Sequence, residues 1–467
     1  MFIAIFLSLG LQLPPGTVAP LDALALDAVV IQAVAMEAVA IEASSPDTIT
    51  LSLDEAIPRA LLHNPALRAQ RADARAVAQD RLAATRAFLP SVRAEVQGVR
   101  TTDPVGVFGV KLRQSAFAQE DLALPALNDP SPLSGFSSSL TVELPLLAPE
   151  GLYGFSAAKH AAEAGAAGAD RARQATAFLV KQAYWDAQLA SLQVEVLDTA
   201  RVAAACHAQQ AKALHDQGLV TGLDARLAHL REAEVEVQRL SAAAEAQNAL
   251  SRLAALLALP ADTPLVLTDP IDAAFTGRIA PASADGPVDR ADLRALRAGA
   301  DAARSAHRGA WAAQLPQLFA FGTLVQHSPD SPWSGGSGDW AVGVGLRWNL
   351  FPGLGGVADV RRSEAEHAAA EARFEDAGRQ VEVQILEAAR FLEAAIEGLA
   401  VADRAEAESR IALDQAELRY RTGQSPVSEL LDVQTATTEA RLRLVTARRD
   451  VLVADAALRF ARGDDDR

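Results

Sequence analysis

The chain is built from one unit that is written twice, and this duplication restricts the fold more than any other feature of the sequence. The first copy opens at Asn64-Pro65 and the second at Arg290-Ala291. Each opening runs through a helix-forming stretch to a Leu-Pro pair, which is Leu89-Pro90 in the first copy and Leu315-Pro316 in the second. Proline removes a backbone donor and clashes with the preceding turn, so both helices are predicted to end there.

Beyond each Leu-Pro pair the sequence predicts a strand, a loop and a second strand. The second strands end at Leu147 in the first copy and at Phe351 in the second. These ends lie closer together in sequence than the two Leu-Pro pairs do, so the first loop, 103–135, is about 20 residues longer than its counterpart. Surface loops tolerate insertions, and we therefore expect 103–135 to be an exposed loop rich in Pro, Ser and Gly.

A very long helix follows each pair of strands. Residues 152–217 and 357–422 contain no proline, and at 1.5 Å per residue each helix would extend about 100 Å. Glycine turns follow at Gly218 and Gly423, and each turn leads into another long helix. The four-three spacing of a heptad seam predicts that the helix at 357–422 coils against a neighbour through Val381, Ile385, Ala388, Leu392, Ala395 and Leu399.

The last strand predicts a membrane environment. From Trp340 to Leu350 apolar residues occupy alternate positions, and the positions between them are mostly small or polar, which is typical of a membrane β-barrel strand. The lumen-facing set would include Gly343, Gly345 and Arg347. The expected lipid-facing set, with a tryptophan near each rim, is Trp340, Val342, Val344, Leu346 and Trp348.

Two of the other strands show the same alternation. One apolar face contains Leu140, Val142 and Leu144, and another contains Val92 and Val96. The strand around residues 319–321 fits either phase. The alternative interpretation is a sheet edge in a soluble α+β domain.

Composition excludes some classes of function. The formal net charge is −16, and an acidic chain lacks the basic surface that nucleic-acid binding needs. The single cysteine, Cys206, has no internal partner and is expected to be a small apolar core residue. The apolar run at residues 2–11 fits the core of a secretory signal, although no Lys or Arg precedes Arg59.

No motif supports an enzyme, a cofactor or a metal site. The run Gly353-Leu354-Gly355-Gly356 superficially resembles a dinucleotide-binding turn, but the strand before it alternates and the helix after it is far too long. We expect these glycines to permit a tight turn from strand to helix. The eight histidines are scattered without metal-ligand spacing, and no catalytic residues, cofactor or metal are predicted.

The order of these elements resembles the TolC-type outer membrane efflux proteins, also called outer membrane factors. The resemblance covers about residues 48–463. It rests on the duplicated order and on short motifs: Leu53-Asp54-Glu55-Ala56, His63-Asn64-Pro65-Ala66-Leu67, Leu89-Pro90 and the two glycine turns.

The resemblance implies a mainly α fold with a small β part. Four strands per protomer would form a trimeric twelve-stranded membrane β-barrel, continued by a periplasmic α-helical barrel. It implies a homotrimer in the cell outer membrane, in contact with outer membrane lipid, with a periplasmic adaptor (membrane fusion) protein and an inner membrane pump as partners. The implied function is a passive duct in a tripartite efflux or type I secretion system, for small molecules (drugs, metals) or proteins. The alternative is a soluble or periplasmic coiled-coil scaffold without channel activity.

The resemblance also implies a gate at the second glycine turn. Such proteins carry a tyrosine three residues before the turn glycine and carboxylates six and nine residues after it, which are Tyr420, Glu429 and Asp432 here. Asp224 takes the corresponding position in the first repeat. An arginine common two residues after the glycine is replaced by Ser425, so at least one gating link must differ.

The charges support a gate on physical grounds. Glu429 and Asp432 are three residues apart and share a helix face. Threefold symmetry would turn each into a ring of like charges, in which each pair at about 6 Å repels by roughly 2–3 kcal/mol at an effective dielectric near 20. Such a ring attracts cations. The alternative is that both carboxylates lie on an ordinary solvated helix face.

These arguments divide the chain into six segments. The expected segments are a signal peptide at 1–25, a low-complexity spacer at 26–47, the first repeat at 48–260, a linker at 261–288, the second repeat at 289–463 and a short acidic tail at 464–467.

Overall fold

The structure is a computed structural model that describes residues 48–274, 289–334, 336–351 and 353–464. The expected signal peptide and spacer lie outside the described residues, as do half of the expected linker and most of the acidic tail. Residues 50–467 form one compact unit, which is described below.

The first repeat follows the predicted order, with one difference. Its elements are α2 (Leu53–His63), α3 (Pro65–Ala84), β2 (Ser91–Thr101), α4 (Pro104–Arg113), α5 (Leu124–Asn128), β3 (Leu133–Leu147), α6 (Pro149–Asp216) and α7 (Gly222–Leu256). The segment 103–135 was expected to be an irregular loop, but it contains α4, α5 and a 3-10 turn (Gln119–Leu122). The Asp103 side chain starts α4 by accepting from the Gly106 amide, and Pro104 supplies the fixed φ of a first helical residue.

The second repeat has the same order. Its elements are α9 (Ala291–Ala312), β5 (Gln317–Ser328), β6 (Ser337–Arg347), α10 (Gly355–Arg421) and α11 (Val427–Arg462). The expected linker contains β4 (Leu265–Leu267) and α8 (Ile271–Ala274), and β4 pairs with β1 (Ile49–Leu51). Gly353 precedes α10 at φ +77°, a left-handed conformation that suits glycine in the turn from strand to helix.

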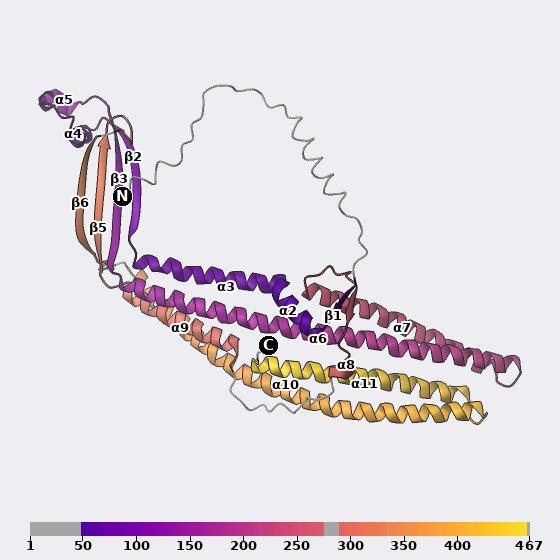
Figure 1. Ribbon diagram of the computed structural model, residues 1–467. Coiled ribbons are helices and arrows are strands. Elements are labelled where there is room, and N and C mark those ends of the chain that lie inside the picture. The colour runs from indigo at the N-terminus through magenta and orange to yellow at the C-terminus, as the bar shows by residue number, and fades with distance from the viewer. Residues whose placement is uncertain (1–47, 275–288, 335, 352, 465–467) are drawn as a thin grey trace, which may run out of the picture. The chain divides into compact units, whose positions relative to one another are not determined.

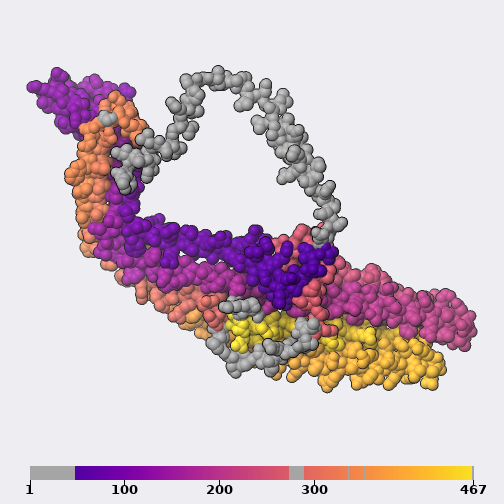
Figure 2. Space-filling view, in the orientation of Figure 1, coloured from indigo at the N-terminus to yellow at the C-terminus, as the bar shows by residue number. Residues whose placement is uncertain are grey.

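The helices of the two repeats pack side by side. Figure 1 shows α6 running beside α3, α9 and α7, while α10 runs beside α11. The predicted heptad seam is confirmed: Val381, Ile385 and Leu392 are buried against Val451 and Leu458, and the other three seam residues pack around them. In the space-filling view, α10 and α11 form the orange and yellow surface beside the magenta α6 and α7 (Figure 2).

A network around the buried Arg290 is joined to the first repeat through Arg171. Arg290 is 4% exposed and donates to Asp292, to the Gln384 side chain at 2.8 Å and to the Ala461 carbonyl at 3.1 Å. Arg171 of α6 joins this group through Asp292 at 3.6 Å. Burial lowers the pKa of the Arg171 guanidinium to about 10. Side chains or carbonyls from α6, α9, α10 and α11 therefore meet in one network.

The main sheet has four antiparallel strands in the order β2-β3-β5-β6. Consecutive strands form two hairpins, and β3 and β5 join them. Figure 1 shows α3 and α9 meeting one end of the sheet and α4 and α5 lying at the other end. Cys206 was expected in the core, but it is exposed, because this helix position points away from the neighbouring helices of its own chain.

Candidate functional site

Two glycine turns close the far ends of the long helices. Gly218 joins α6 to α7 at φ +74°, and Gly423 joins α10 to α11 at φ +70°. The amide after each glycine donates to the carbonyl five residues earlier, at 2.9 Å in the first turn and 2.8 Å in the second. This is the Schellman ending, which glycine adopts without the steric cost of a Cβ.

Tyr420 is a core residue of the second tip. It is 7% exposed and packs with Val427 and Leu430, while Leu214 and Leu227 from the first helix pair cover the same cluster. Its buried hydroxyl makes no hydrogen bond with any described residue. Burial raises the pKa of this hydroxyl, and the charge of Asp224 raises it further. Tyr420 therefore lies where the two helix pairs meet.

The predicted carboxylates differ in their surroundings. Glu429 forms an ion pair with Arg419 across the turn, with 2.8 Å between Oε1 and Nη1, whereas Asp432 is exposed on α11. Asp224 caps α7: its carboxylate accepts from the Thr221 amide at 3.1 Å and from the Thr221 hydroxyl at 2.7 Å. Tyr420, Glu429 and Asp432 thus share one tip, but Glu429 is partly neutralised.

Arg419 is the residue at this tip that sequence reasoning missed. Ser425, two residues after the turn glycine, is the position at which one gating link was expected to differ. Its hydroxyl is buried and has no hydrogen-bond partner among the described residues. An arginine in the last turn of one helix and a glutamate in the first turn of the next, joined by a tight glycine turn, is a sequence signal for this ion pair.

His207 marks a second contact between the helix pairs. It lies on α6, is 7% exposed, and its Nε2 is 3.9 Å from Oε1 of Glu417 on α10. Its Nδ1 is buried without a hydrogen-bond partner among the described residues. Burial lowers the pKa of His207, Glu417 opposes this shift, and Arg421 adds to it. The neutral imidazole is therefore the form that suits this interface.

The sheet presents one continuous apolar face. The strand register places Val142, Gly322 and Val342 in one row and Leu144, Ala320 and Val344 in another. The large side chains of this face are exposed in the single chain: Val92, Val96, Leu140, Val142, Leu324, Trp340, Val342, Val344 and Leu346. An exposed apolar surface of this extent marks a membrane or protein contact.

The opposite face is polar and contains two aromatic rings. The register puts Phe321 beside Gly343 and Phe319 beside Gly345, which resolves the phase that the sequence left open. A Cβ on either glycine would come within 3 Å of the facing ring. The Arg347 guanidinium lies 4.7 Å from the centre of the Phe319 ring, and its Nη1 is 3.9 Å from Oε1 of Glu143. Positions 343 and 345 therefore require glycine, because the rings of Phe321 and Phe319 cover them.

The aromatic ends of β6 differ from the expectation. The strand ends at Arg347, three residues before the predicted end, because the chain turns toward α10. Trp348 therefore lies beyond the strand and donates from Nε1 to the Gln314 carbonyl at 3.0 Å. At the other end, the Ser138 hydroxyl on the apolar face donates to the Pro332 carbonyl, and the adjacent Trp333 is 83% exposed.

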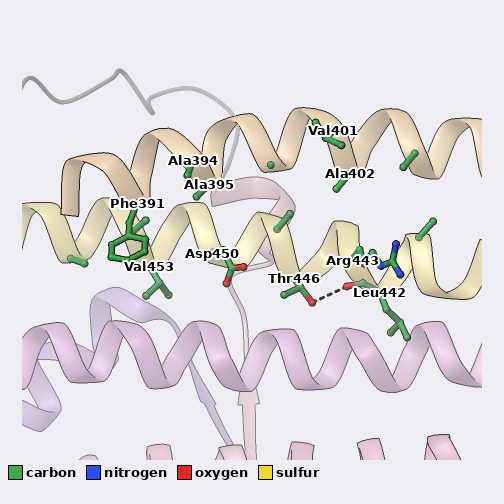
Figure 3. A pocket seen from close by; sticks show the side chains of 16 residues that line it. Phe391, Ala394, Ala395, Val401, Ala402, Leu442, Arg443, Thr446, Asp450 and Val453 are labelled. Carbon is green, nitrogen blue, oxygen red and sulfur yellow. Dashed lines mark hydrogen bonds between the residues drawn. The ribbon is translucent and has the colours of Figure 1, made fainter. Parts of the chain in front are cut away.

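A groove of about 880 Å³ runs between α10 and α11. Figure 3 shows Phe391, Val401 and Val453 among the alanines that line it. Asp450 and Arg443 are its charged residues, and the Thr446 hydroxyl donates to the Leu442 carbonyl at 2.8 Å. An apolar groove between two coiled helices offers a packing surface for another helix.

Comparison with known families matches residues 56–259 and 288–464 to the model of outer membrane efflux proteins. The two matched segments together cover most of the chain. The chain belongs to the outer membrane efflux protein family. As a family member it is an outer membrane channel protein, as the sequence predicted, and its family consists of channels.

Solved structures of outer membrane channels share the fold of this efflux protein. VceC of Vibrio cholerae is 18% identical, with a TM-score of 0.72 over 88% of this chain and 96% of VceC. CmeC of Campylobacter jejuni is 16% identical, with a TM-score of 0.73 over 88% of this chain and 85% of CmeC. MtrE of Neisseria gonorrhoeae, solved in an open state, is 19% identical, with a TM-score of 0.72 over 88% of each chain. No curated protein sequence matches this chain significantly.

The described residues of the efflux protein contain neither a metal-ligand cluster nor a membrane-spanning helix. No group of three or more His, Cys, Asp or Glu side chains within the described ranges could hold a metal ion. Among the described residues, none of the helices is long and apolar enough to cross a membrane. The contrasting faces of the sheet and the polar tips of the long helices are the features on which a function can be argued.

Proposed function

We propose that three copies of this efflux protein assemble into a passive duct through the outer membrane. The observation that carries the proposal is the four-stranded sheet, which has one mainly apolar exposed face and one polar face. In the sheet as described, β2 and β6 each have a strand neighbour on one side only.

The sheet requires partner copies if it is to lie in lipid. An unpaired backbone group in the bilayer costs several kcal/mol, so a membrane sheet must close on itself. Four strands are too few, because the smallest common membrane barrels have eight. Three copies would give twelve strands, with β2 of one copy beside β6 of the next. The set Trp340, Val342, Val344 and Leu346 would then face lipid, and Gly343, Gly345 and Arg347 the lumen.

The helices would continue the duct into the periplasm. Each copy contributes two long helix pairs, one from each repeat, and we propose that the boundaries 48–260 and 289–463 describe these repeats. The apolar groove between α10 and α11 supports close packing of helices from neighbouring copies. The duct would accept cargo from an inner membrane pump through a periplasmic adaptor, either as an efflux or as a type I secretion component.

We place the periplasmic gate of this duct at the tips of α10 and α11. Tyr420 lies at the contact between the helix pairs, so separating the pairs would expose it. Asp432 is exposed and would form the ring of three charges, while Glu429 would contribute according to its pairing with Arg419. Asp224 would act indirectly, because it holds the start of α7.

The trimer can be tested by native mass spectrometry in a mild detergent. We expect three chains per particle, together with ion conductance in a planar bilayer. A stable monomer that conducts no ions would contradict the proposal. Chemical crosslinking in intact outer membranes provides the control for detergent effects, and it should give the same three-chain product.

A further inference from the structure

The insertion between β2 and β3 places a helix on the polar face of the sheet. Gly135 is buried in β3 and pairs with Val99. A Cβ on Gly135 would meet Val110 Cγ1 at 2.9 Å and Gln114 Nε2 at 2.8 Å, so α4 covers it. Strand alternation puts Gly135 on the same side as Thr141, which is the polar face.

Side-chain hydrogen bonds hold α4 across the end of the sheet. The helix begins just after β2, and at its other end the Gln114 amide donates to the Ser134 carbonyl of β3 at 3.4 Å and to the Ser328 carbonyl of β5 at 3.2 Å. The Ser337 hydroxyl at the start of β6 donates to the Arg113 carbonyl. The helix is thus attached to all four strands at the end farthest from α3 and α9 (Figure 1).

The opposite side of α4 is apolar and exposed. Val107 is 5% exposed on the sheet side, whereas Val105 is 78%, Phe108 37% and Leu112 50% exposed. Their spacing of three and four places these last three residues on one helix face. Gly109 lies between them, and a Cβ there would meet nothing within 4 Å. Phe108 packs edge-to-face on Phe117, with 4.8 Å between the ring centres, so Val105, Gly109 and Leu112 form the part of the stripe that is open to a partner, and the small Gly109 allows close approach.

The dimensions of the proposed barrel identify what covers this stripe. Twelve strands about 4.8 Å apart and tilted by about 40° enclose a radius of roughly 12 Å. A helix with its side chains is about 10 Å in diameter. A helix lying on the inner wall therefore reaches almost to the axis, where it meets its two symmetry mates. Lipid lies on the other side of the wall and cannot cover this stripe.

We propose that the three α4 helices pack against one another on the threefold axis and close the outer mouth of the duct. This inference rests on the proposed trimer. The contacts are Val105, Leu112 and the exposed part of the Phe108 ring of each copy, which form an apolar constriction. Such a constriction stops ions by excluding water from the pore, so it would seal the duct at the end opposite to the charged helix tips. Cargo would displace the helices, which are attached to the strands by a few hydrogen bonds.

Cysteine crosslinking tests the contact between copies. Leu112→Cys, in a Cys206→Ala background, should give a covalent dimer within the trimer on treatment with a short bis-maleimide. The control is Trp333→Cys, which is exposed at the same end of the sheet beside the apolar face and should give several-fold less product. Native mass spectrometry of the same variant shows whether the trimer itself has formed. A trimer without the Leu112→Cys crosslink overturns the closure, whereas the absence of a trimer overturns the proposed function and the closure with it.

Thiol labelling in intact cells tests the seal itself. Thr323→Cys lies on the polar face of β5, and a bulky hydrophilic maleimide added outside the cells should reach it slowly. Replacing Phe108 and Leu112 together by Ser should accelerate this labelling several-fold, because the constriction becomes wet. Labelling that is equally fast in both proteins would overturn the proposal.

Discussion

The charge at the proposed periplasmic gate depends on one arginine. Glu429 is paired with Arg419, so Asp432 is the more effective acid in a ring of three. We expect Arg419→Gln to increase cation selectivity and divalent-cation block, because it leaves Glu429 uncompensated. Asp432→Asn should decrease both properties.

Single-channel recordings of the purified trimer provide the measurement. Arg443→Gln is a matched control, because Arg443 is paired with Glu439 on α11 away from the tip. If Glu429→Gln combined with Asp432→Asn leaves selectivity and block unchanged, the gate does not lie at these residues.

The two faces of β6 predict different costs for a buried charge. Val344 is 65% exposed in the single chain and would lie against lipid near mid-membrane, so Val344→Arg should destabilise the trimer by about 2–4 kcal/mol. Ala341 lies on the polar face of the same strand, beside Thr323, and Ala341→Arg should cost much less. Thermal dissociation of the detergent-solubilised trimer measures both. Equal losses would show that the assignment of the faces is wrong.

Residue types predicted the apolar face of the sheet well, because alternation directly reports which side chains share a face. They did not predict the positions of Phe319 and Phe321. Both faces of that strand contain apolar residues, and only the glycines opposite the two rings show where the rings fit. Cys206 was misplaced for a related reason: in an alanine-rich helix, small residues occupy every face, so burial cannot be read from residue type.

Among the elements, α6 and α10 meet through a contact that should respond to acid. Burial lowers the pKa of His207 in the folded protein below its ordinary value of 6.5. Between the folded pKa and 6.5, the unfolded chain binds more protons at this site than the native protein. Stability from His207 is therefore complete above pH 6.5 and is lost as the pH falls toward the folded pKa.

Thermal melting at about pH 7.5 and about pH 5.5 tests this contact. The native protein should lose more stability on acidification than His207→Gln does. His229→Gln is the control, because His229 is exposed on α7. The same pH dependence in the native protein and in His207→Gln would contradict the role assigned to the buried imidazole.

The elements were predicted unevenly. The long helices α6 and α10 begin and end within three residues of the expected bounds, since a proline-free stretch between a strand and a glycine turn leaves few alternatives. The helix α4 was missed, because a ten-residue segment with three valines and two glycines has weak helical propensity. Its Asp-Pro start was the available signal, and its packing on the sheet stabilises it.

At the scale of the whole molecule, Arg290 lies at the centre of a network that Arg171 joins to the first repeat. Arg290→Met would remove the charged donor to the Ala461 carbonyl and would leave Asp292 with Arg171 at 3.6 Å, and we expect a loss of about 2–3 kcal/mol. Arg294→Met is the control, because the Arg294 side chain is about half exposed and its ion pair with Asp289 should contribute less than about 1 kcal/mol. Denaturant unfolding compares the two variants, and similar losses would show that the Arg290 network stabilises the fold no more than an exposed ion pair does.

The duplication gave the order of elements in both repeats, and it extends to one side-chain contact at the start of each repeat. Arg290 occupies the position that corresponds to Asn64 in the first repeat, and Asn64 bonds the Leu256 carbonyl within its own repeat. Arg290 donates to the Ala461 carbonyl near the end of α11, so in both copies this position contacts the end of the last long helix of its own repeat.

The facing rings and glycines of β5 and β6 also set an order of assembly for the sheet. Large and small side chains that alternate across one strand pair fix its register, because a slip would drive a ring into an occupied position. The β5–β6 hairpin pairs strands that are close in sequence. The pairing of β3 with β5 joins strands that are separated in sequence by α6, α7 and α9. Closing so long a loop is slow. Each copy should therefore form its two hairpins early and join them late, so that the unpaired edges of β2 and β6 meet neighbours only after the long helices have folded.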